Sequence, residues 1–238
     1  MRENAGLATV VCVHGAGGGG WEWGIWARVL AVRGFAVIAP DLMPVAAGIE
    51  KTSFAEYRDQ VVEWCRGIGE GVVLAGASLG GLLALAAAPV VKPAALVLVN
   101  PLPPAGVLAG RAQAPRQPIV PWARERSLAA TRRAMPDADD AARLYALRRW
   151  RDESGTVLNE ARGGIGVESV RCPTLILASE LDVDVPAAAA RALAVRLSAD
   201  LRSIPGASHV GPLLGRAAAE SAVQAAAWLA ERVPAVTA

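Results

Sequence analysis

The chain has 238 residues, of which 53% are apolar and 19% charged, and its formal net charge is +2. This length and apolar content predict one α/β domain with a large core and a small insertion. The arginines are scattered, so nucleic-acid binding has no electrostatic support. Gly and Pro break every apolar stretch before the ~18 residues that a membrane span needs, and we expect no membrane partner and no signal peptide.

The three cysteines, Cys12, Cys65 and Cys172, are an odd number for a chain of this size. They indicate free thiols in a reducing compartment, so the cytoplasm is the expected location. Cys12 and Cys172 fall in apparent strands, where cysteine is usually a small core residue. Without a Cys-x-x-Cys motif or a histidine cluster, the sequence suggests neither a metal nor a cofactor.

Short β-branched runs alternate with helical segments along the chain. The run from Leu7 to Val13 is continuously apolar, which is typical of a strand buried on both faces. Ser53, with Glu56 three residues on, is a plausible N-cap for a helix that reaches about Ile68. Further strands are expected at 35–39, 72–74, 95–99, 174–178 and 201–204. Further helices are expected at about 23–33, from the glycines near 80 to Pro89, at 187–197 and at 216–232, with a loop at 42–52.

The alternation stops after Pro101. Six prolines fall in residues 101–121, and residues 122–152 carry two Trp, many Arg and helical spacing. These features predict an inserted, mostly helical cap. The predicted division is a core of residues 1–100 and 169–238 and a cap of residues 101–168.

Strands that alternate with helices predict a doubly wound, mostly parallel sheet with helices on both faces. In such sheets the chemistry gathers at the carboxyl ends of the strands. Five polar residues stand just after predicted strands, and this shared placement indicates an active site: His14, Ser78, Asn100, Asp182 and His209.

The segment from Val72 to Pro89 is the centre of this prediction. It contains Gly76-Ala77-Ser78-Leu79-Gly80-Gly81 between a strand and a helix. A sharp strand-to-helix bend strains the residue at its apex and needs small neighbours, because the two backbones pass closely. Ser78 would then present its hydroxyl beside the positive end of a helix. A plain Gly/Ser turn is the alternative.

A serine nucleophile needs a base within hydrogen-bond reach. The chain has only two histidines. His209 lies in a late loop and is the predicted general base, with a surface loop histidine as the alternative. His14 precedes the glycine run and is expected to order that turn through its side chain.

The base needs a carboxylate behind it, which should follow the next-to-last strand. Asp182 is the preferred candidate, and Asp184 is the alternative unless it caps the helix after Pro186. Glu180 is expected to be a loop charge. Asp41 also follows a strand, but it precedes Ser78, and the order Ser, acid, His argues against it as the triad acid. We interpret Asp41 as a turn-capping residue.

The oxyanion of a tetrahedral intermediate needs preformed donors, which backbone amides supply. The Leu79 amide follows the nucleophile at a helix N-terminus. A second amide should come from the glycine-rich loop at 15–20, where Ala16 is preferred and Gly17 comes next. A phosphate-binding loop is the alternative, but no Lys follows these glycines and no ribose-binding acid stands at the expected spacing.

Taken together, these residues resemble the α/β-hydrolase superfamily over nearly the whole chain except the predicted cap. A narrower resemblance, to the plant methylesterase and hydroxynitrile lyase group, rests on five further motifs: His14-Gly15-Ala16, Gly20-Trp21-Glu22-Trp23, Ala39-Pro40-Asp41-Leu42, Phe54-x-x-Tyr57 and Gly206-Ala207-Ser208-His209. The resemblance implies triad roles for Ser78, Asp182 and His209 and oxyanion roles for the amides of Ala16 and Leu79. It also implies about six parallel strands, because the family's first two antiparallel strands have no counterpart.

The sequence departs from this group at three positions. The lyases resemble one another in a Thr after the first His and a Lys after the catalytic His, where this chain has Gly15 and Val210. Without that hydroxyl and that cation, cyanide chemistry is disfavoured. Ala77 precedes the nucleophile, where relatives often have His or Glu.

Seven of the eleven aromatic residues are Trp. Trp23 and Trp26, three apart on one helix, are expected in the core rather than in a pocket. Trp21 in the oxyanion loop and Trp122 and Trp150 in the cap are the predicted pocket residues. A Trp-bearing cap above a serine site predicts a medium-sized, mainly apolar acyl or alkyl group.

We therefore expect a cofactor-independent serine hydrolase that cleaves a small-molecule carboxylic ester through an acyl-enzyme, as a monomer or homodimer. Thioesterase or lactonase activity with the same triad is a close alternative. Carbon–carbon bond hydrolysis or perhydrolysis is a further one. A non-catalytic ligand-binding protein on the same fold is the alternative from a different class.

Overall fold

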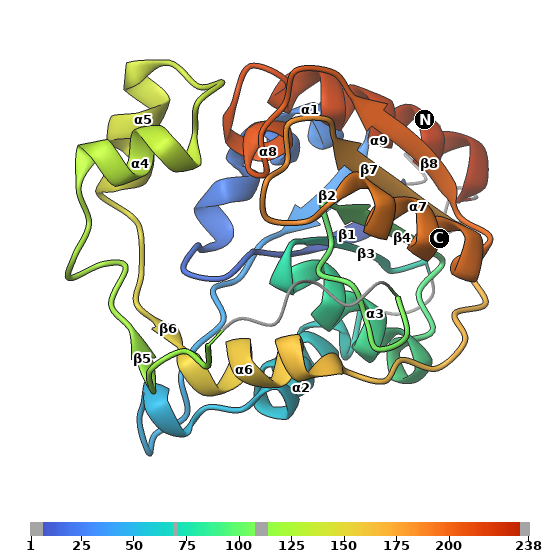
Figure 1. Cartoon of the computed structure of the whole chain (residues 1–238). Coiled ribbons are helices and arrows are strands. Elements are labelled where there is room, and N and C mark those ends of the chain that lie inside the picture. Colours follow the sequence, from blue (N-terminus) through green and yellow to red (C-terminus); the bar gives the residue numbers. More distant parts are fainter. Residues whose placement is uncertain (1–6, 69–70, 108–113, 234–238) are drawn as a thin grey trace.

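A six-stranded parallel sheet forms the centre of the molecule (Figure 1). The computed structural model describes residues 7–68, 71–107 and 114–233. The strand order is β2-β1-β3-β4-β7-β8, and every pairing is parallel. The strands are β1 (Leu7–Val13), β2 (Phe35–Ile38), β3 (Val73–Ala77), β4 (Ala95–Val99), β7 (Thr174–Ser179) and β8 (Asp200–Ile204).

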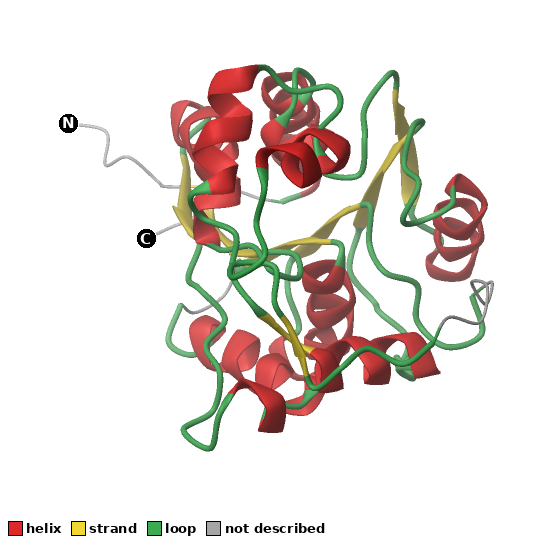
Figure 2. Cartoon of the chain, turned by 60° about the vertical axis from the view of Figure 1, so that its left-hand side comes forward, coloured by secondary structure: helices red, strands yellow, loops and turns green. Residues whose placement is uncertain are grey.

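Helices cover both faces of this sheet, as Figures 1 and 2 show. On one face lie α1 (Gly24–Val32), α8 (Gly211–Leu214) and α9 (Ala218–Arg232). On the other lie α2 (Phe54–Cys65), α3 (Leu79–Val91), α6 (Gly155–Gly164) and α7 (Ala187–Leu197). Because successive side chains of a strand point to opposite faces, β1 contributes Val10 and Cys12 to one apolar cluster and Val11 and Val13 to the other. The predicted fold class is confirmed.

The local predictions are largely confirmed. Ser53 and Glu56 form a full capping box at the start of α2. Trp23 and Trp26 are buried core residues whose rings pack edge to face at 5.3 Å. The three cysteines are unpaired, but Cys172 precedes β7 and is only half-buried, so its assignment to a strand was wrong. No helix in the described part of the chain combines the length and apolarity that crossing a bilayer needs.

Several short elements were not predicted. The helix expected at 23–33 begins with a 3-10 turn, η1 (Gly20–Trp23), before α1. Another 3-10 turn, η2 (Ile49–Lys51), lies in the expected loop at 42–52. The helix α8 was likewise missed, because one turn of helix gives no apolar period in the sequence.

The predicted cap segment, residues 101–168, leaves the sheet after β4 and returns before β7. It contains α4 (Leu128–Ala134), α5 (Asp140–Leu147) and a two-stranded antiparallel sheet of β5 (Ile119–Val120) and β6 (Glu153–Ser154). Its last helix, α6, packs into the same apolar cluster as α2 and α3. In Figure 1, α4 and α5 stand apart from the sheet, and the β5–β6 pair lies near α6.

The bend between β3 and α3 depends on close backbone contact. A Cβ atom on Gly80 would lie closer than 3.0 Å to the carbonyl oxygens of Val13 and His14, at the end of β1. A Cβ on Gly76 would meet the Gly80 carbonyl at a similarly forbidden distance. Both contacts are with backbone, which cannot rotate away as a side chain can. The two glycines therefore allow β1, β3 and α3 to converge.

We expect Gly80→Ala to lower the free energy of unfolding by about 1–3 kcal/mol or more, because the added methyl overpacks backbone. Gly24→Ala is the matched control, since a Cβ there meets nothing within 4 Å and the residue is already helical, at φ −58°. It should stabilise the protein by about 0.5 kcal/mol. Urea unfolding of both variants measures the two effects, and equal effects would contradict this account of the bend.

Candidate active site

Ser78 stands at the bend between β3 and α3, as the sequence predicted. Its backbone has φ 52° and ψ −118°, a conformation that non-glycine residues rarely adopt. The strain is held in place by pairing, because the Ser78 amide donates to the Val99 carbonyl at 3.0 Å, which extends the β3–β4 pairing past the last strand residue. Its carbonyl in turn accepts from the amides of Gly81 and Leu82 in the first turn of α3. The backbone of Ser78 is thereby fixed at the carboxyl edge of the sheet.

His209 and Asp182 are joined directly. The His209 Nδ1 donates to Asp182 Oδ2 at 2.7 Å. The other carboxylate oxygen of Asp182 accepts the amides of Asp184 at 2.8 Å and Val185 at 2.9 Å. The Asp182 side chain is 2% exposed, and the His209 side chain is 13% exposed. The carboxylate is therefore fixed by two amides and orients the ring through a third bond.

The alternative acids take other positions. Asp184 does not cap α7, whose N-cap is Pro186 without a side-chain bond. Glu180 is exposed and accepts from the Ser203 hydroxyl at 3.1 Å. The ligand atoms of Asp182, Asp184 and His209 lie within 4.8 Å of one another, a spacing that a cation could share. The Nδ1 of His209 is already bonded to Asp182, which favours a catalytic pair over a metal site.

Asn100 connects the serine side of the site to the histidine side. It follows β4 in the left-handed conformation, at φ 44°, and is buried. Its side-chain amide donates to the His209 carbonyl at 2.7 Å and to Ser179 Oγ at 2.8 Å, while its Oδ1 accepts the Ser179 amide. Since Ser78 pairs with Val99, the residue before Asn100, the His209 loop is bonded to the strand end next to the serine.

The hydrogen bond between Ser78 Oγ and His209 Nε2 is not formed; within the described residues, the partner of the His209 ring is Asp182. Such bonds are often long in unliganded hydrolases and tighten when substrate binds. The structure thus brings the acid and the base together after β7 and β8 and places the nucleophile after β3, at the same carboxyl edge of the sheet. The catalytic role of the three residues stays a prediction.

The environment of His209 favours a raised pKa. Burial alone would lower the pKa of this imidazole, but the hydrogen bond and the charge of Asp182, with the charge of Asp184, outweigh it and raise the pKa. A general base works in its neutral form. We therefore expect the acid limb of the kcat/KM profile to lie above pH 6.5, the ordinary value for histidine, and to move to lower pH in Asp184→Asn. Initial rates between pH 5 and 9 test this, and a limb below pH 6.5 would contradict it.

The glycine-rich loop after β1 lies against Ser78. A Cβ on Gly15 would lie 3.4 Å from the Ser78 Cβ. The Gly15 amide donates to Glu22 Oε2 at 3.2 Å, and the Gly17 amide donates to Glu153 Oε2 at 2.9 Å. Between them, the Ala16 amide forms no hydrogen bond within the described residues. This favours Ala16 over the alternative Gly17 as an oxyanion donor. The Leu79 amide begins α3, where helical amides lack intrahelical partners.

His14 orders its turn through its side chain, as predicted. The Leu42 amide donates to its Nε2 at 2.9 Å, so the proton resides on Nδ1, which bonds the Gly15 carbonyl at 2.8 Å. Burial lowers the pKa of His14 to about 4, so the ring is neutral. Asp41 does more than cap a turn, because it accepts the Gly20 amide at 2.7 Å and pairs with Arg151 at 3.4 Å.

Three acidic residues for which no role was predicted contact the loops of this site. Glu22 and Glu153 accept amides of the glycine-rich loop. Asp137, between α4 and α5, accepts the Ser208 hydroxyl at 2.5 Å and the Ser208 amide at 3.0 Å, one residue before His209. No local sequence pattern predicts these contacts. Asp137 lies 71 residues from its partner, and Glu153 lies 136 residues from its partner.

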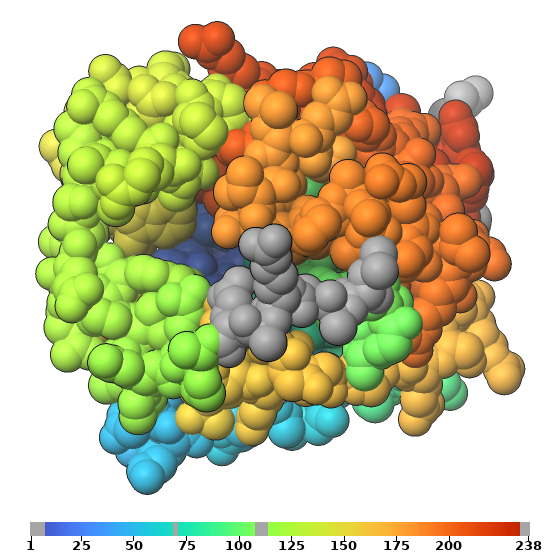
Figure 3. All heavy atoms as spheres, in the orientation of Figure 1, coloured from blue at the N-terminus to red at the C-terminus, as the bar shows by residue number. Residues whose placement is uncertain are grey.

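The three tryptophans predicted to line the pocket, Trp21, Trp122 and Trp150, have two kinds of contact. Trp122 lies over Gly17 and is 37% exposed. Trp21 packs edge to face against Trp150 at 5.5 Å and Tyr145 at 5.7 Å, so these rings join the predicted cap to the glycine-rich loop. Figure 3 shows a hollow between the green cap residues and the orange residues near 180, with blue residues of the N-terminal part at its floor. The pocket role stays a prediction.

Comparison with known proteins agrees with the fold. The model of an alpha/beta hydrolase family matches residues 10–224. A pyrethroid hydrolase from Sphingobium faniae JZ-2 is 22% identical, with a TM-score of 0.71 over 94% of this chain and 99% of that one. The methylesterase MES16 from Arabidopsis is 15% identical, with a TM-score of 0.71 over 94% and 98%.

A thioesterase domain from the curacin biosynthetic pathway is 20% identical, with a TM-score of 0.69 over 94% of this chain and 90% of that one. A search of curated protein sequences found no match. Structural likeness at these identities shows the fold, whereas the family model covers most of the sequence itself. The chain belongs to the alpha/beta hydrolase family.

Proposed function

We propose that this protein is a serine hydrolase that cleaves a carboxylic ester of a small to medium apolar substrate through an acyl-enzyme. The observation that carries the proposal is the 2.7 Å bond between His209 and a buried Asp182, at the edge of the sheet where Ser78 is held in a strained bend. A strained serine, an oriented imidazole and a buried carboxylate are the parts that activate a hydroxyl at neutral pH.

Each step follows from these positions. His209 Nε2 accepts the Ser78 hydroxyl proton as Oγ attacks the ester carbonyl carbon. The amides of Ala16 and Leu79 donate to the resulting oxyanion, which they stabilise more than the ground-state carbonyl. His209 returns the proton to the leaving alcohol, and the acyl group remains on Ser78. A water that His209 deprotonates then attacks the acyl carbon. As the bond from the acyl carbon to Ser78 Oγ breaks, His209 returns the proton to Oγ, which releases the acid and restores the serine.

The surroundings of the site support an apolar substrate. Trp122 is partly exposed over Gly17, and Leu181 and Val183, beside Asp182, are 58% and 91% exposed. Apolar side chains with a few polar groups are usual in pockets for small organic ligands. Thioesters and lactones undergo the same acyl transfer, so the substrate panel must include them.

The test combines a substrate panel with an active-site probe. We expect turnover of p-nitrophenyl esters, compared with matched thioesters and lactones of the same acyl length. A fluorophosphonate should label the protein once, at Ser78, by peptide mapping. Turnover confined to thioesters or lactones would change the substrate class. Absence of both turnover and labelling would overturn the proposal in favour of a ligand-binding protein on a hydrolase fold.

A further inference from the structure

Two buried carboxylates contact the glycine-rich loop on either side of Ala16. Glu22, in η1, accepts the Gly15 amide, and Glu153, in β6, accepts the Gly17 amide. Glu22 is 5% exposed and Glu153 is 3% exposed. Buried carboxylates are costly, so each needs donors that compensate for the loss of water. Here the donors are the amides that flank the proposed oxyanion donor.

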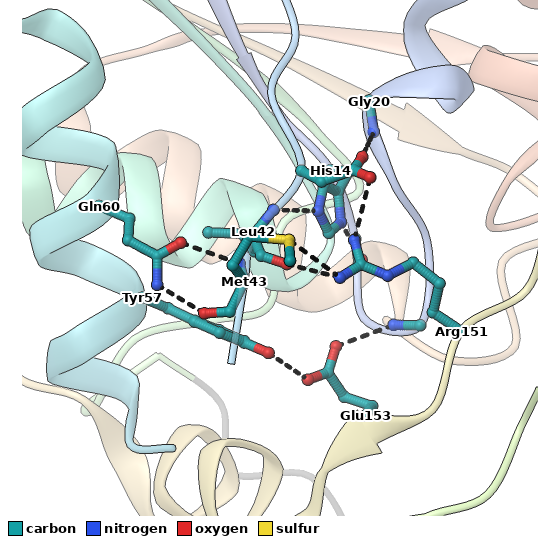
Figure 4. Close-up of polar contacts among 11 residues, drawn as sticks. His14, Gly20, Leu42, Met43, Tyr57, Gln60, Arg151 and Glu153 are labelled. Carbon is teal, nitrogen blue, oxygen red and sulfur yellow. Dashed lines mark hydrogen bonds and ion pairs between the residues drawn. The ribbon is translucent and has the colours of Figure 1, made fainter. Parts of the chain in front are cut away.

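Glu153 has the more complete set of partners (Figure 4). Its Oε2 accepts the Gly17 amide at 2.9 Å, and its Oε1 accepts the Tyr57 hydroxyl at 3.1 Å and the Ser154 amide at 2.8 Å. The Arg151 amide donates to the Gly17 carbonyl at 2.8 Å. Both polar groups of the Gly17 backbone are therefore bonded to residues that lie 134 and more positions later in the chain.

This double contact restricts the Gly17 peptide. Gly17 has φ 69°, a left-handed conformation that a glycine adopts at little cost but does not retain without restraint. The Ala16 amide belongs to the preceding peptide unit, between Gly15 and Ala16. A shift of the Gly17 backbone would move the Ala16 Cα, to which that unit is attached, and would change the direction of the Ala16 amide. Catalytic donors must be held close to their working geometry, because small displacements cost large factors in rate.

We infer that Glu153 is a positioning residue for the reaction: by holding the Gly17 amide it leaves the Ala16 amide aimed at the oxyanion. The inference rests on the proposed function, since it assigns a role within that chemistry. Glu153 acts through the backbone and does not contact the reacting atoms. It belongs to the predicted cap, so a part of the cap would be needed for the chemical step as well as for substrate selection.

The charges around the loop are compatible with this role. Burial raises the pKa of Glu22 to about 8, so near pH 7 its carboxyl is largely neutral and does not oppose an oxyanion. Burial also raises the pKa of Glu153, but the amides of Gly17 and Ser154, the Tyr57 hydroxyl and the nearby Arg151 act in the opposite direction. The advantage of Glu153 must then be geometric, because a negative charge near the oxyanion would by itself be unfavourable.

The test is Glu153→Ala with Tyr57→Phe as the matched control. Tyr57→Phe removes a donor from Oε1 and leaves the Gly17 contact on Oε2 intact. We expect Glu153→Ala to lower kcat for a p-nitrophenyl ester about 10- to 100-fold with KM within about threefold. Tyr57→Phe should keep kcat within about threefold, and Glu153→Gln, which can offer one oxygen to Gly17, should fall between.

Two further measurements distinguish a positioning role of Glu153 from a general loss of structure. Binding of phenylboronic acid, whose serine adduct mimics the tetrahedral intermediate, should weaken by the same factor as kcat/KM falls. The Gly17 amide should exchange with solvent slowly in the wild type and Tyr57→Phe but fast in Glu153→Ala. A wild type without ester turnover would overturn the proposed function, and amide exchange would still test the contact. Unchanged kcat in Glu153→Ala, or equal losses in Tyr57→Phe, would overturn the inference.

Discussion

Replacing Ser78 by Ala should reduce ester hydrolysis by about 10⁴-fold or more while the protein stays folded. The change removes only the hydroxyl oxygen, and without it no acyl-enzyme can form. A loss of this size corresponds to about 5.5 kcal/mol of transition-state stabilisation. The helix and strand on either side keep their contacts, because those are made by the backbone of Ser78 and by its neighbours.

Ser78→Gly tests the backbone strain at the same position. The bend has φ 52° and ψ −118°, which glycine adopts without the strain that serine bears. We expect this variant to be as inactive as Ser78→Ala but more stable than it by about 1 kcal/mol or more. Initial rates and thermal unfolding measure both effects. Retained turnover in Ser78→Ala would overturn the serine mechanism, and equal stability of the variants would remove the argument for strain.

The fold was predictable because each central strand is buried on both faces and therefore forms a continuous apolar run. The bend at Ser78 was equally visible, since close backbone contact leaves no choice but glycine at Gly76 and Gly80. The sequence separated Asp182 from Asp184 only by a capping role expected of Asp184, which the structure does not show, and it is Asp182 that bonds to His209. Local sequence patterns are therefore sufficient to predict the sheet, the bend and the order of the polar residues along the chain.

The contacts that hold the loops in place could not be read from the sequence. Glu153 lies in a two-residue strand, too short to give a period, and its partner Gly17 is 136 positions away. Asp137 likewise lies in a turn between α4 and α5 and reaches Ser208. A single acidic residue in a polar insertion looks like a solvated surface charge. Only the three-dimensional arrangement shows that both are bonded to loops of the candidate site.

These two residues suggest a common role for the predicted cap. Glu153 contacts the loop that carries the Ala16 amide, and Asp137 contacts the loop that carries His209. Arg151 adds a third connection, donating to the Leu42 carbonyl at 2.8 Å beside the His14 ring (Figure 4). An insertion bonded to three loops at the edge of the sheet restrains their positions relative to one another, which is the geometry that preorganised catalysis requires.

The second large effect concerns the acid behind His209. Asp182→Asn should lower kcat about 10³- to 10⁴-fold, because an amide in this place can donate to Nδ1 and so favour the tautomer whose Nε2 carries the proton and cannot act as a base. The variant should also lose the negative charge that stabilises the imidazolium. The bonds from the amides of Asp184 and Val185 can persist on the remaining carbonyl oxygen, so the loop need not collapse.

Asp184→Asn is the matched control for Asp182→Asn, since it removes an equal charge two residues away without touching the ring bond. Its kcat on the alkaline plateau of the pH profile should stay within about threefold of the wild type, because the charge of Asp184 only adds to the raised pKa of His209 and the base is deprotonated in both enzymes on that plateau. If the two variants lost activity in the opposite order, Asp184 would be the working acid, and the 2.7 Å bond to Asp182 would describe a resting arrangement. Equal small losses in both would mean that His209 needs no carboxylate to act as base, and the triad would reduce to a pair.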